Sequence, residues 1–480
     1  MFQKSFEHLL LKPKHLFPVL LLFGIGLAYI ANFNGLYGQD SHEYFRYSAV
    51  LSDYFKHEGL NENFYWTVLY PLFGSLLNLI FGQGPFNLQL ISIASYAGAS
   101  VFMLQTLKDR NTEKSIVYYL LLTFILSPNI LKSGLQVMSE PLALLFIVSS
   151  FYFYQRFLKD PNEKDFILIS VTVSLAFFTR YAVILVLLPL AIHSLHIIFR
   201  QKNYRAIFLG LVILIIVSLP EYFLSPQITE SITSNYFLGE WSVNNLFSKE
   251  FRTIDGEHTF RYPNIVFLSS VIWHPVFFFP FFPSCFFYKK EDFRLFERIL
   301  LLGVLSYCIL IGGLPFQNLR MLLPIYPVLV ICNYPATLRL FNFIESKVQK
   351  RIRNLIPKGL VLLQLSFFAY LFIIFINRNY LEKRIATHIK TAGYSRVFSH
   401  DIDVGVNSYL TKDQKVKNLI TDLHNFQNDD ILILNLEQYE RIWHNSNVES
   451  NLLEALEMHD TLRLVSLESN WVVFKLNKRR

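Results

Sequence analysis

The first candidate for chemistry is a carboxylate that follows an apolar segment near the start of the chain. Asp40 lies in the sequence GQDSHEY at residues 38–44, a few residues after the apolar run 16–33. An aspartate held at the edge of a membrane segment could act as a general base and deprotonate an attacking hydroxyl group. The pattern also suits a helix-capping aspartate, with Glu43 three residues further on as in a capping box. The motif by itself is compatible with both interpretations.

Three more charged residues lie at the ends of apolar segments. Glu140 begins one segment, Arg180 separates two segments in a tight hairpin, and Arg320 begins another. Ionisable groups at membrane depth are costly unless they have a partner or a task, and a guanidinium binds phosphate through two parallel hydrogen bonds. Each residue also has a structural interpretation. Glu140 suits a helix cap, Arg180 could pair with Glu140 or Glu221, and Arg320 could reach towards the lipid headgroups.

Motifs for metal and cofactor chemistry are weak or absent. The outer loop 225–262 contains Glu257 and His258, which are residue types that bind metal ions, but they lack a fixed ligand spacing. We therefore expect no cofactor, with a divalent metal ion as the alternative. The sequence has no P-loop, no GxGxxG after a strand, no HExxH and no GxSxG in a suitable context. Nucleotide hydrolysis, dinucleotide redox chemistry and the zincin and serine-hydrolase mechanisms therefore have no support.

The elements that position these residues are predicted to be membrane helices. Of the 480 residues, 52% are hydrophobic and 17% are charged, whereas an ordinary soluble protein has about 25% charged residues. A helix needs about 20 apolar residues to cross a bilayer. Segments of this kind occupy residues 16–33, 86–107, 116–131, 138–157, 166–179, 181–199, 206–224, 263–287, 296–314, 319–341 and 357–376. The pattern predicts an α-helical polytopic membrane protein with about 11 transmembrane helices.

The basic residues predict which side of the membrane each segment faces. With the N-terminus inside, the cytoplasmic segments contain 21 Lys and Arg residues, and the outer segments before the last span contain 8. Because Lys and Arg concentrate in cytoplasmic loops, this asymmetry predicts an N-inside, C-outside topology. The loops also account for the net charge of +8 without a nucleic-acid partner. The sequence has no Asn-x-Ser/Thr sequon, which favours a bacterial inner membrane.

Two parts of the chain are predicted to lie outside the membrane core. The stretch 68–82 is apolar but too short to cross, so we expect it to be interfacial or re-entrant within a long first outer loop, 34–85. After residue 376 the composition becomes polar, and helix-like stretches alternate with strand-like runs. The sequence therefore predicts a transmembrane domain, 1–376, and a small extracytoplasmic α/β domain, 377–480.

The order of these motifs resembles the type C (GT-C) glycosyltransferase superfamily, specifically the bacterial relatives of protein O-mannosyltransferases and of the lipid A aminoarabinose transferase. The resemblance covers residues 1–376. Two features depart from it: Ser41 follows Asp40 where the protein mannosyltransferases have an adjacent Asp-Glu pair, and the lysine before the Pro/Tyr segment of the aminoarabinose transferases has no counterpart. The matching features are GQDSHEY at 38–44, LYPLF at 69–73, and later landmarks at 127–128, 138–140, 179–181 and 320–327.

The resemblance implies a polyprenyl-phosphate sugar donor and an inverting transfer to an acceptor hydroxyl group on the outer face. It implies Asp40 as the catalytic base, Glu140 as a second active-site carboxylate, and Arg180 and Arg320 as ligands of the donor phosphate. The expected partners are the lipid bilayer, the donor, and an acceptor that is a lipid, a glycan or a protein. Further candidate substrate-binding residues are Glu43, Tyr44, Tyr70 and His258.

Two other functional classes remain open from the sequence. A polytopic transporter or flippase of a lipid-linked or envelope substrate predicts ionisable groups near mid-membrane and internal repeats, whereas the candidates here lie at outer helix ends. A catalytically silent scaffold predicts that the outer domain, 377–480, binds envelope partners. Transport by the purified protein in liposomes distinguishes the first class, and deletion of the outer domain distinguishes the second.

Overall fold

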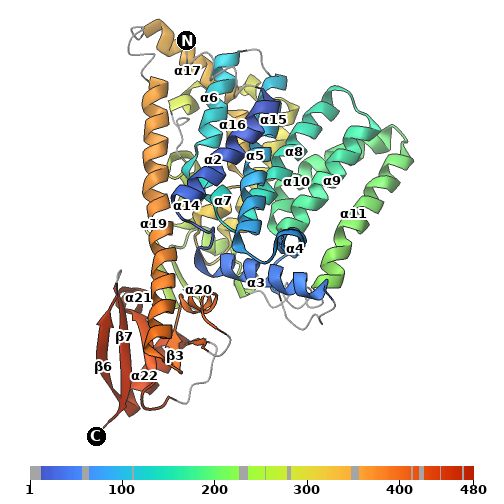
Figure 1. The fold of residues 1–480 in the computed structure, drawn as a ribbon. Coiled ribbons are helices and arrows are strands. Elements are labelled where there is room, and N and C mark those ends of the chain that lie inside the picture. Colours follow the sequence, from blue (N-terminus) through green and yellow to red (C-terminus); the bar gives the residue numbers. More distant parts are fainter. Residues whose placement is uncertain are drawn as a thin grey trace.

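The computed structural model describes most of the chain in two parts, a helical bundle and a small mixed domain (Figure 1). The bundle carries its main hydrophobic core between the transmembrane helices, and a second apolar cluster surrounds the segment just after the first of them. The described residues are 12–56, 64–110, 113–225, 236–253, 256–277, 283–347, 356–411, 414–420, 426–443, 445–467 and 470–479.

Seven helices among the described residues are long and apolar enough to cross a membrane. A further apolar helix, α9 (Glu163–Thr179), has 17 residues and packs against α8 and α11. The lipid-facing character of the bundle is clearest in α11, which exposes Phe208, Ile215 and Phe223. The seven are α2 (Pro13–Ile30), α5 (Pro85–Arg110), α8 (Glu140–Lys159), η1 with α10 (Tyr181–Val183 and Ile184–Arg200), α11 (Tyr204–Leu224), α15 (Leu295–Gly312) and α19 (Ile356–Ala392).

Two of the predicted spans are broken at a proline. Helices α6 (Lys114–Ile125) and α7 (Pro128–Leu135) meet at 53°, because Ser127 precedes Pro128 and adopts an extended ψ of 120°. The segment Leu319–Cys332, which contains η5 (Leu319–Leu322) and α16 (Tyr326–Cys332), meets α17 (Tyr334–Lys347) at 56°, next to Pro335. If each bent pair is one span, the described residues contain up to nine spans.

The 11 predicted segments exceed this number partly because residues 263–287 are not one long helix in the part that the structure describes. Helix α14 (Asn264–Trp273) has 10 residues, and His274 then becomes extended. The reason is Pro275, since a proline disfavours the helical conformation of the residue before it. A 3-10 turn, η3 (Pro283–Phe287), follows residues 278–282, which lie outside the described residues.

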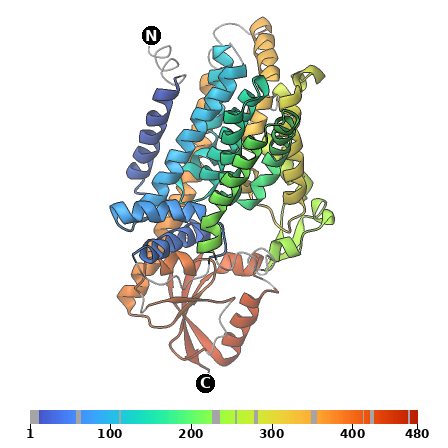
Figure 2. The ribbon, with the colours of Figure 1, turned by 90° about the vertical axis from the view of Figure 1, so that its right-hand side faces the viewer.

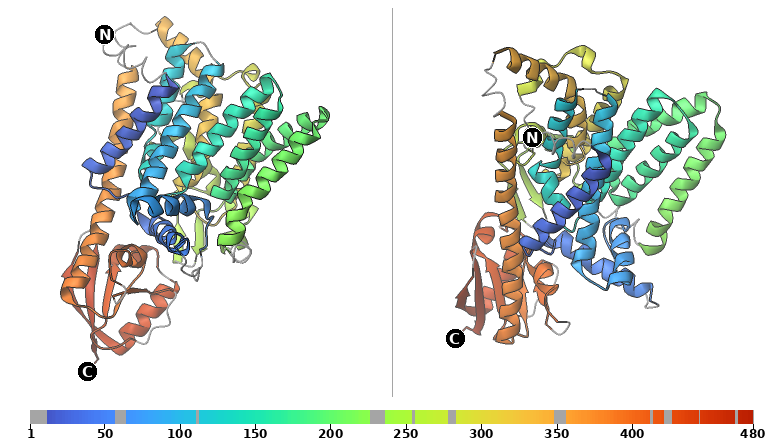
Figure 3. Two further views of the ribbon diagram at one scale, coloured as in Figure 1. Left: turned by 45° about the vertical axis from the view of Figure 1, so that its right-hand side comes forward. Right: turned by 45° about the horizontal axis from the view of Figure 1, so that its top comes forward.

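Two helices of the first outer loop lie across one end of the bundle, as the sequence predicts. Helix α3 (Gly38–Tyr54) carries the acidic motif, and the short apolar helix α4 (Leu69–Phe81) packs against it. Figure 2 and Figure 3 show both helices at the end of the bundle that faces the small mixed domain. The start of α2 lies at the opposite end (Figure 1). The bundle thus separates the start of α2 from the C-terminal domain, as an N-inside, C-outside topology requires; which end is cytoplasmic stays a prediction.

The C-terminal part forms the predicted α/β domain around a sheet that has five strands among the described residues. The strand order is β4-β3-β5-β7-β6. Strand β3 is parallel to β4 and β5, whereas β7 is antiparallel to β5 and β6. Helix α19 continues without a break from the bundle to Ala392, so the predicted boundary after residue 376 lies inside a helix. The elements are β3 (Val397–Ser399), α20 (Asp403–Asn407), β4 (Val416–Asn418), β5 (Ile431–Asn435), α21 (Leu436–Arg441), α22 (Asn447–Met458), β6 (His459–Ser466) and β7 (Trp471–Lys478).

A small hairpin connects the two parts. Strands β1 (Glu250–Thr253) and β2 (Gly256–Thr259) pair antiparallel, and the backbone N–H of Glu257 donates to the carbonyl oxygen of Ile442 at 3.0 Å. The hairpin therefore rests on the C-terminal domain. Shorter elements of the described chain are α13 (Tyr236–Gly239), η2 (Val243–Leu246) and η4 (Lys290–Asp292).

A close approach of two helices in the bundle gives a test of the fold. A Cβ atom at Gly303 of α15 would lie 2.1 Å from the carbonyl oxygen of Val186 in α10, and a backbone oxygen cannot rotate away. We expect Gly303→Ala to lower the free energy of unfolding by about 1–3 kcal/mol. Thermal unfolding in detergent measures this. The matched control is Gly26→Ala in α2, where nothing lies within 4 Å of the added atom; equal stability of the two variants would contradict this packing.

Candidate active site

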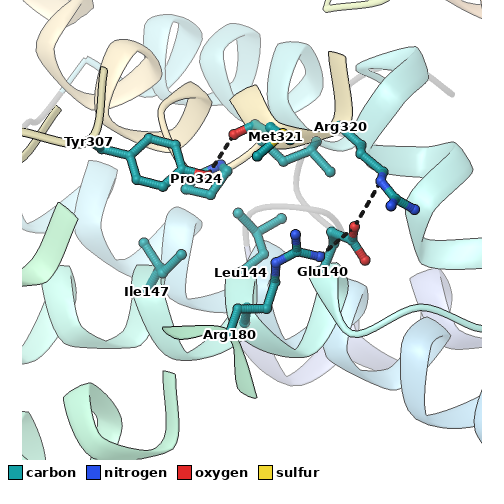
Figure 4. Close-up of a pocket in the computed structure, with 10 residues that line it drawn as sticks. Glu140, Leu144, Ile147, Arg180, Tyr307, Arg320, Met321 and Pro324 are labelled. Carbon is teal, nitrogen blue, oxygen red and sulfur yellow. Dashed lines mark hydrogen bonds and ion pairs between the residues drawn. The ribbon is translucent and has the colours of Figure 1, made fainter. Parts of the chain in front are cut away.

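The four charged residues singled out in the sequence meet in one cluster. Arg320 of η5 forms an ion pair with Asp40 of α3, and its Nε lies 3.6 Å from Oε1 of Glu140. Arg180 reaches the same carboxylate from the other side, with Nη1 2.6 Å from Oε1. Figure 4 shows the two guanidinium groups converging on Glu140. We call Asp40, Glu140, Arg180 and Arg320 the charged quartet.

Local sequence explains how each side chain is presented. Gly38 has a φ of +68°, which starts α3 just before Asp40. Pro141 occupies the first turn of α8, so Glu140 lies at the helix N-terminus, where a negative charge is favoured. Arg180 is extended between α9 and η1. The side chain of Asn318 caps η5 by accepting a hydrogen bond from the backbone N–H of Arg320 at 3.1 Å.

The quartet is electrically balanced and partly shielded from solvent. Two carboxylates face two guanidinium groups, and the Glu140 side chain is only 5% exposed. Of the two partners that the sequence offers Arg180, the structure selects Glu140. Glu221 instead accepts hydrogen bonds from the Tyr181 hydroxyl group at 2.7 Å and the Val68 N–H at 3.0 Å. Arg180 therefore holds the buried carboxylate in place, because an isolated buried charge would be costly.

The four further candidates occupy different environments. Glu43 pairs with Arg46 on the surface of α3, with 2.7 Å between Oε2 and Nη2. The motif therefore does not form the capping box, and Tyr37 is the N-cap residue. His258 lies on strand β2, stacked 6.1 Å from Phe260. His258 therefore lies in the hairpin that contacts the C-terminal domain and not in the charged quartet.

Two buried tyrosines lie on the helices of the first outer loop, Tyr44 on α3 and Tyr70 on α4. The hydroxyl group of Tyr44 lies 2.9 Å from Oγ of Ser139, the residue before Glu140. Burial raises the pKa of Tyr44, and the Glu140 carboxylate adds to this rise against the opposite effect of Arg180. The hydroxyl group of Tyr70 lies 2.8 Å from Oγ of Ser92. Both side chains are almost fully buried, so they form part of the packed core next to the quartet.

A large cavity of about 540 Å³ lies beside the quartet and shares Arg320 with it. This volume is within the range of ligand pockets. Its lining includes the basic residues Lys132 and Arg261 together with His274, and aromatic rings such as Trp273. No Asp or Glu belongs to this lining in the described part of the chain. The cavity therefore favours a ligand that is anionic at one end and apolar along its length.

Lys132 was not among the site residues that the sequence indicates. It lies on α7 with Nζ 4.7 Å above the ring of Phe375, and no ion pair to a carboxylate is formed by Lys132 within the described residues. A signal was present, because a lysine interrupts the apolar run between 116 and 135. The hydropathy pattern places Lys132 in an outer loop after the span 116–131. In the structure it lies on helix α7 instead.

The structure also bears on metal binding. Across the described ranges, no group of three or more His, Cys, Asp or Glu side chains is placed to hold a metal ion. Glu257, the neighbour of His258 in the sequence, accepts a hydrogen bond from Asn445 at 3.2 Å. The alternative of a bound divalent metal ion stays a prediction.

Comparisons with known proteins agree with this architecture. Residues 67–222 match the family model described as dolichyl-phosphate-mannose-protein mannosyltransferase. ArnT from Cupriavidus metallidurans bound to undecaprenyl phosphate has a TM-score of 0.58 and 13% identity, over 94% of this chain and 97% of ArnT. The apo structure of the same protein gives 0.56 with the same identity and coverage. No curated protein sequence matches significantly. The predicted resemblance is thus confirmed at the level of architecture: the chain has the fold of the type C membrane glycosyltransferases.

Proposed function

We propose that the protein transfers a sugar from a polyprenyl-phosphate donor to an acceptor hydroxyl group at the outer face of the membrane. The observation that carries this proposal is the position of Arg320, which joins the candidate base Asp40 to the basic, aromatic cavity. The match to a family of lipid-phosphate-sugar transferases supports it, and so does the likeness in fold to ArnT, whose crystal structure holds undecaprenyl phosphate. The acceptor is a lipid, a glycan or a protein.

The donor phosphate fits the cavity side of the quartet. Three cations, Lys132, Arg261 and Arg320, line the cavity, whereas Arg180 lines only the smaller pocket around Glu140. A phosphate needs space as well as cations, and the cavity offers both. We therefore assign the phosphate to the three cations that line the cavity, Lys132, Arg261 and Arg320, and assign Arg180 to holding Glu140. The polyprenyl chain would lie against the aromatic and aliphatic lining.

Arg320 can alternate between two anions. In the structure it is paired with Asp40, so the carboxylate oxygen that faces Arg320 is occupied by the guanidinium. When a phosphate competes for the guanidinium, the Asp40 carboxylate is released beside the reacting centre. The base then becomes effective only when donor is present, which limits unproductive chemistry.

In the transfer step, each bond that forms or breaks and the transferred proton are accounted for by the acceptor, the donor and Asp40. The acceptor oxygen attacks the anomeric carbon, and its proton passes to the Asp40 carboxylate. The bond from the anomeric carbon to the phosphate oxygen breaks with inversion, and the electron pair leaves on the polyprenyl phosphate. Arg320 and the nearby cations stabilise the charge that grows on that phosphate. Glu140 fixes Arg320 from the opposite side at 3.6 Å.

Binding of the carrier lipid tests the phosphate assignment without knowledge of the sugar. We expect Lys132→Met to weaken undecaprenyl phosphate binding about 5- to 30-fold, because one charge-assisted hydrogen bond contributes about 1–2 kcal/mol. Native mass spectrometry or a thermal-shift titration of the purified protein measures this. Lys249→Met, at an exposed lysine of the outer loop, should leave the affinity unchanged. Equal affinities of Lys132→Met and the wild type would contradict the assignment of Lys132 to the donor phosphate.

The transporter alternative makes a different prediction. A flippase needs a path for the polar headgroup through the bundle. The charged quartet instead includes Asp40 of α3, and α3 lies across one end of the bundle (Figure 1). Movement of a fluorescent polyprenyl phosphate across liposomes by the wild type, undiminished in Asp40→Asn, would overturn the proposed transferase function.

A further inference from the structure

The helix that carries Asp40 also contacts the C-terminal part of the chain, through His42. His42, two residues after Asp40, is 1% exposed, and its Nε2 lies 3.1 Å from Oε2 of Glu382 on α19. Its Nδ1 lies 2.8 Å from Oγ of Ser408, which follows α20. Both ring nitrogens of His42 are therefore bound by residues of the C-terminal part.

Glu382 is enclosed as tightly as His42. It is 1% exposed, and Nε of Arg378 lies 2.9 Å from its Oε1. A Cβ atom on Gly405 of α20 would come within 2.6 to 2.9 Å of the Glu382 carboxyl group, so α20 lies directly against it. Arg378 in turn donates to the carbonyl oxygen of Asp401 at 2.9 Å. The carboxylate is thus fixed by α3, α19 and α20 together.

A second contact secures the chain just before α3. The side-chain amide of Asn379 donates to the carbonyl oxygen of Leu36 and to Oδ1 of Asn34, both at 3.0 Å. The ring of Tyr37 packs edge-on against Phe375, with 3.9 Å between the centroids. Successive turns of α19 therefore hold both the segment just before α3 and His42 within the helix.

The two faces of α3 have different partners. Residues two apart on a helix point in widely different directions, so Asp40 faces Arg320 while His42 faces α19 and α20. The helix lies between these contacts. A change on the His42 face would therefore be passed to Asp40 as a shift of the helix.

We propose that His42 and Glu382 are positioning residues through which the C-terminal domain sets the place of Asp40 in the active site. The proposal rests on the proposed function and gives the C-terminal domain a role inside the catalytic unit. It also differs from a scaffold, because the contact is made to the motif helix itself. We expect this buried pair to fix the position of α3 relative to α19 and α20.

The experiment compares kinetics and hydrogen exchange in the full-length protein in detergent. We expect Glu382→Ala and His42→Ala each to lower kcat by about 10- to 100-fold, because a small misplacement of a catalytic group has this effect. The KM for the donor should change less than about twofold, since the cavity is untouched. The double variant should be no slower than the slower single one. Glu382→Gln, which keeps a hydrogen bond to His42, should restore most of the rate.

A matched control removes a different buried carboxylate of the same domain. Asp430 is 1% exposed and pairs with Arg396 at 2.8 Å within the C-terminal domain. Asp430→Asn should lower the unfolding temperature without a selective loss of kcat. If Glu382→Ala behaves like this control, or if the effects of His42→Ala and Glu382→Ala multiply, the positioning role is overturned.

Hydrogen exchange separates this inference from the proposed function. In Glu382→Ala and in the milder Gly405→Ala, backbone amides of residues 38–47 should exchange about tenfold faster, while those of α4 stay unchanged. This readout needs no sugar donor, so it applies even if the wild type transfers no sugar. Unchanged exchange at residues 38–47 overturns the inference, whereas faster exchange in a protein without transferase activity overturns only the proposed function.

Discussion

Asp40→Asn should reduce sugar transfer by about 10²–10⁴-fold while the protein stays folded, because it removes the proton acceptor without changing the size of the side chain. Donor binding should be kept, since the cavity cations remain and Arg320 no longer has an ion pair with Asp40. The measurement is consumption of a polyprenyl-phosphate sugar by purified protein in mixed micelles with an extract that contains acceptor.

The control for this variant lies on the same helix. Asp53 is partly exposed near the end of α3, where it pairs with Lys56 at 3.8 Å. Asp53→Asn should keep the wild-type rate within about twofold. A rate of Asp40→Asn equal to that of Asp53→Asn would show that Asp40 is a structural aspartate, which is the other interpretation that the motif allows.

Arg320→Met should lower kcat/KM by about 10²–10³-fold, because a preorganised donor to the developing phosphate charge is lost. The same change leaves Asp40 without its cation and takes one contact from Glu140. Arg320→Lys should recover only part of the rate, since an ammonium group cannot hold two anions with the planar geometry of a guanidinium. Steady-state kinetics with varied donor measure both variants.

An exposed arginine serves as the reference for loss of charge alone. Arg298 of α15 donates to the carbonyl oxygen of Phe293 at 2.7 Å and lies away from the quartet. Arg298→Met should transfer sugar normally. If Arg320→Met loses no more activity than Arg298→Met, then Arg320 only reaches towards the headgroups, and the link between base and phosphate fails.

Hydropathy predicted most of the membrane helices because burial in lipid depends on composition over about 20 residues. It could not place the breaks. Ser127 leaves the helical conformation before Pro128, and His274 does so before Pro275, although the surrounding residues are apolar. Likewise, α19 continues past residue 376 into mixed polar sequence, because Leu381, Ile385 and Ile389 on one side of it pack into the hydrophobic core of the C-terminal domain.

The quartet could be proposed from sequence because each of its residues is a charge at the end of an apolar segment. What the sequence could not show is which charges are neutralised. Arg180 pairs with Glu140, whereas Lys132 lies over an aromatic ring without an ion pair among the described residues. These pairings join segments far apart in the chain, so no local pattern reveals them. The contact of His42 with Glu382, 340 positions away, is of the same kind.

The most direct test of the central claim is mass spectrometry of lipid extracts from cells that carry either the wild-type protein or Asp40→Asn. A transferase that cannot deprotonate its acceptor leaves its donor unused, so the account predicts that one polyprenyl-phosphate sugar accumulates in the mutant. That species would identify the sugar. Identical lipid extracts, in cells where Asp40→Asn still causes a defect, would contradict the assignment of a polyprenyl-phosphate donor and favour a transporter.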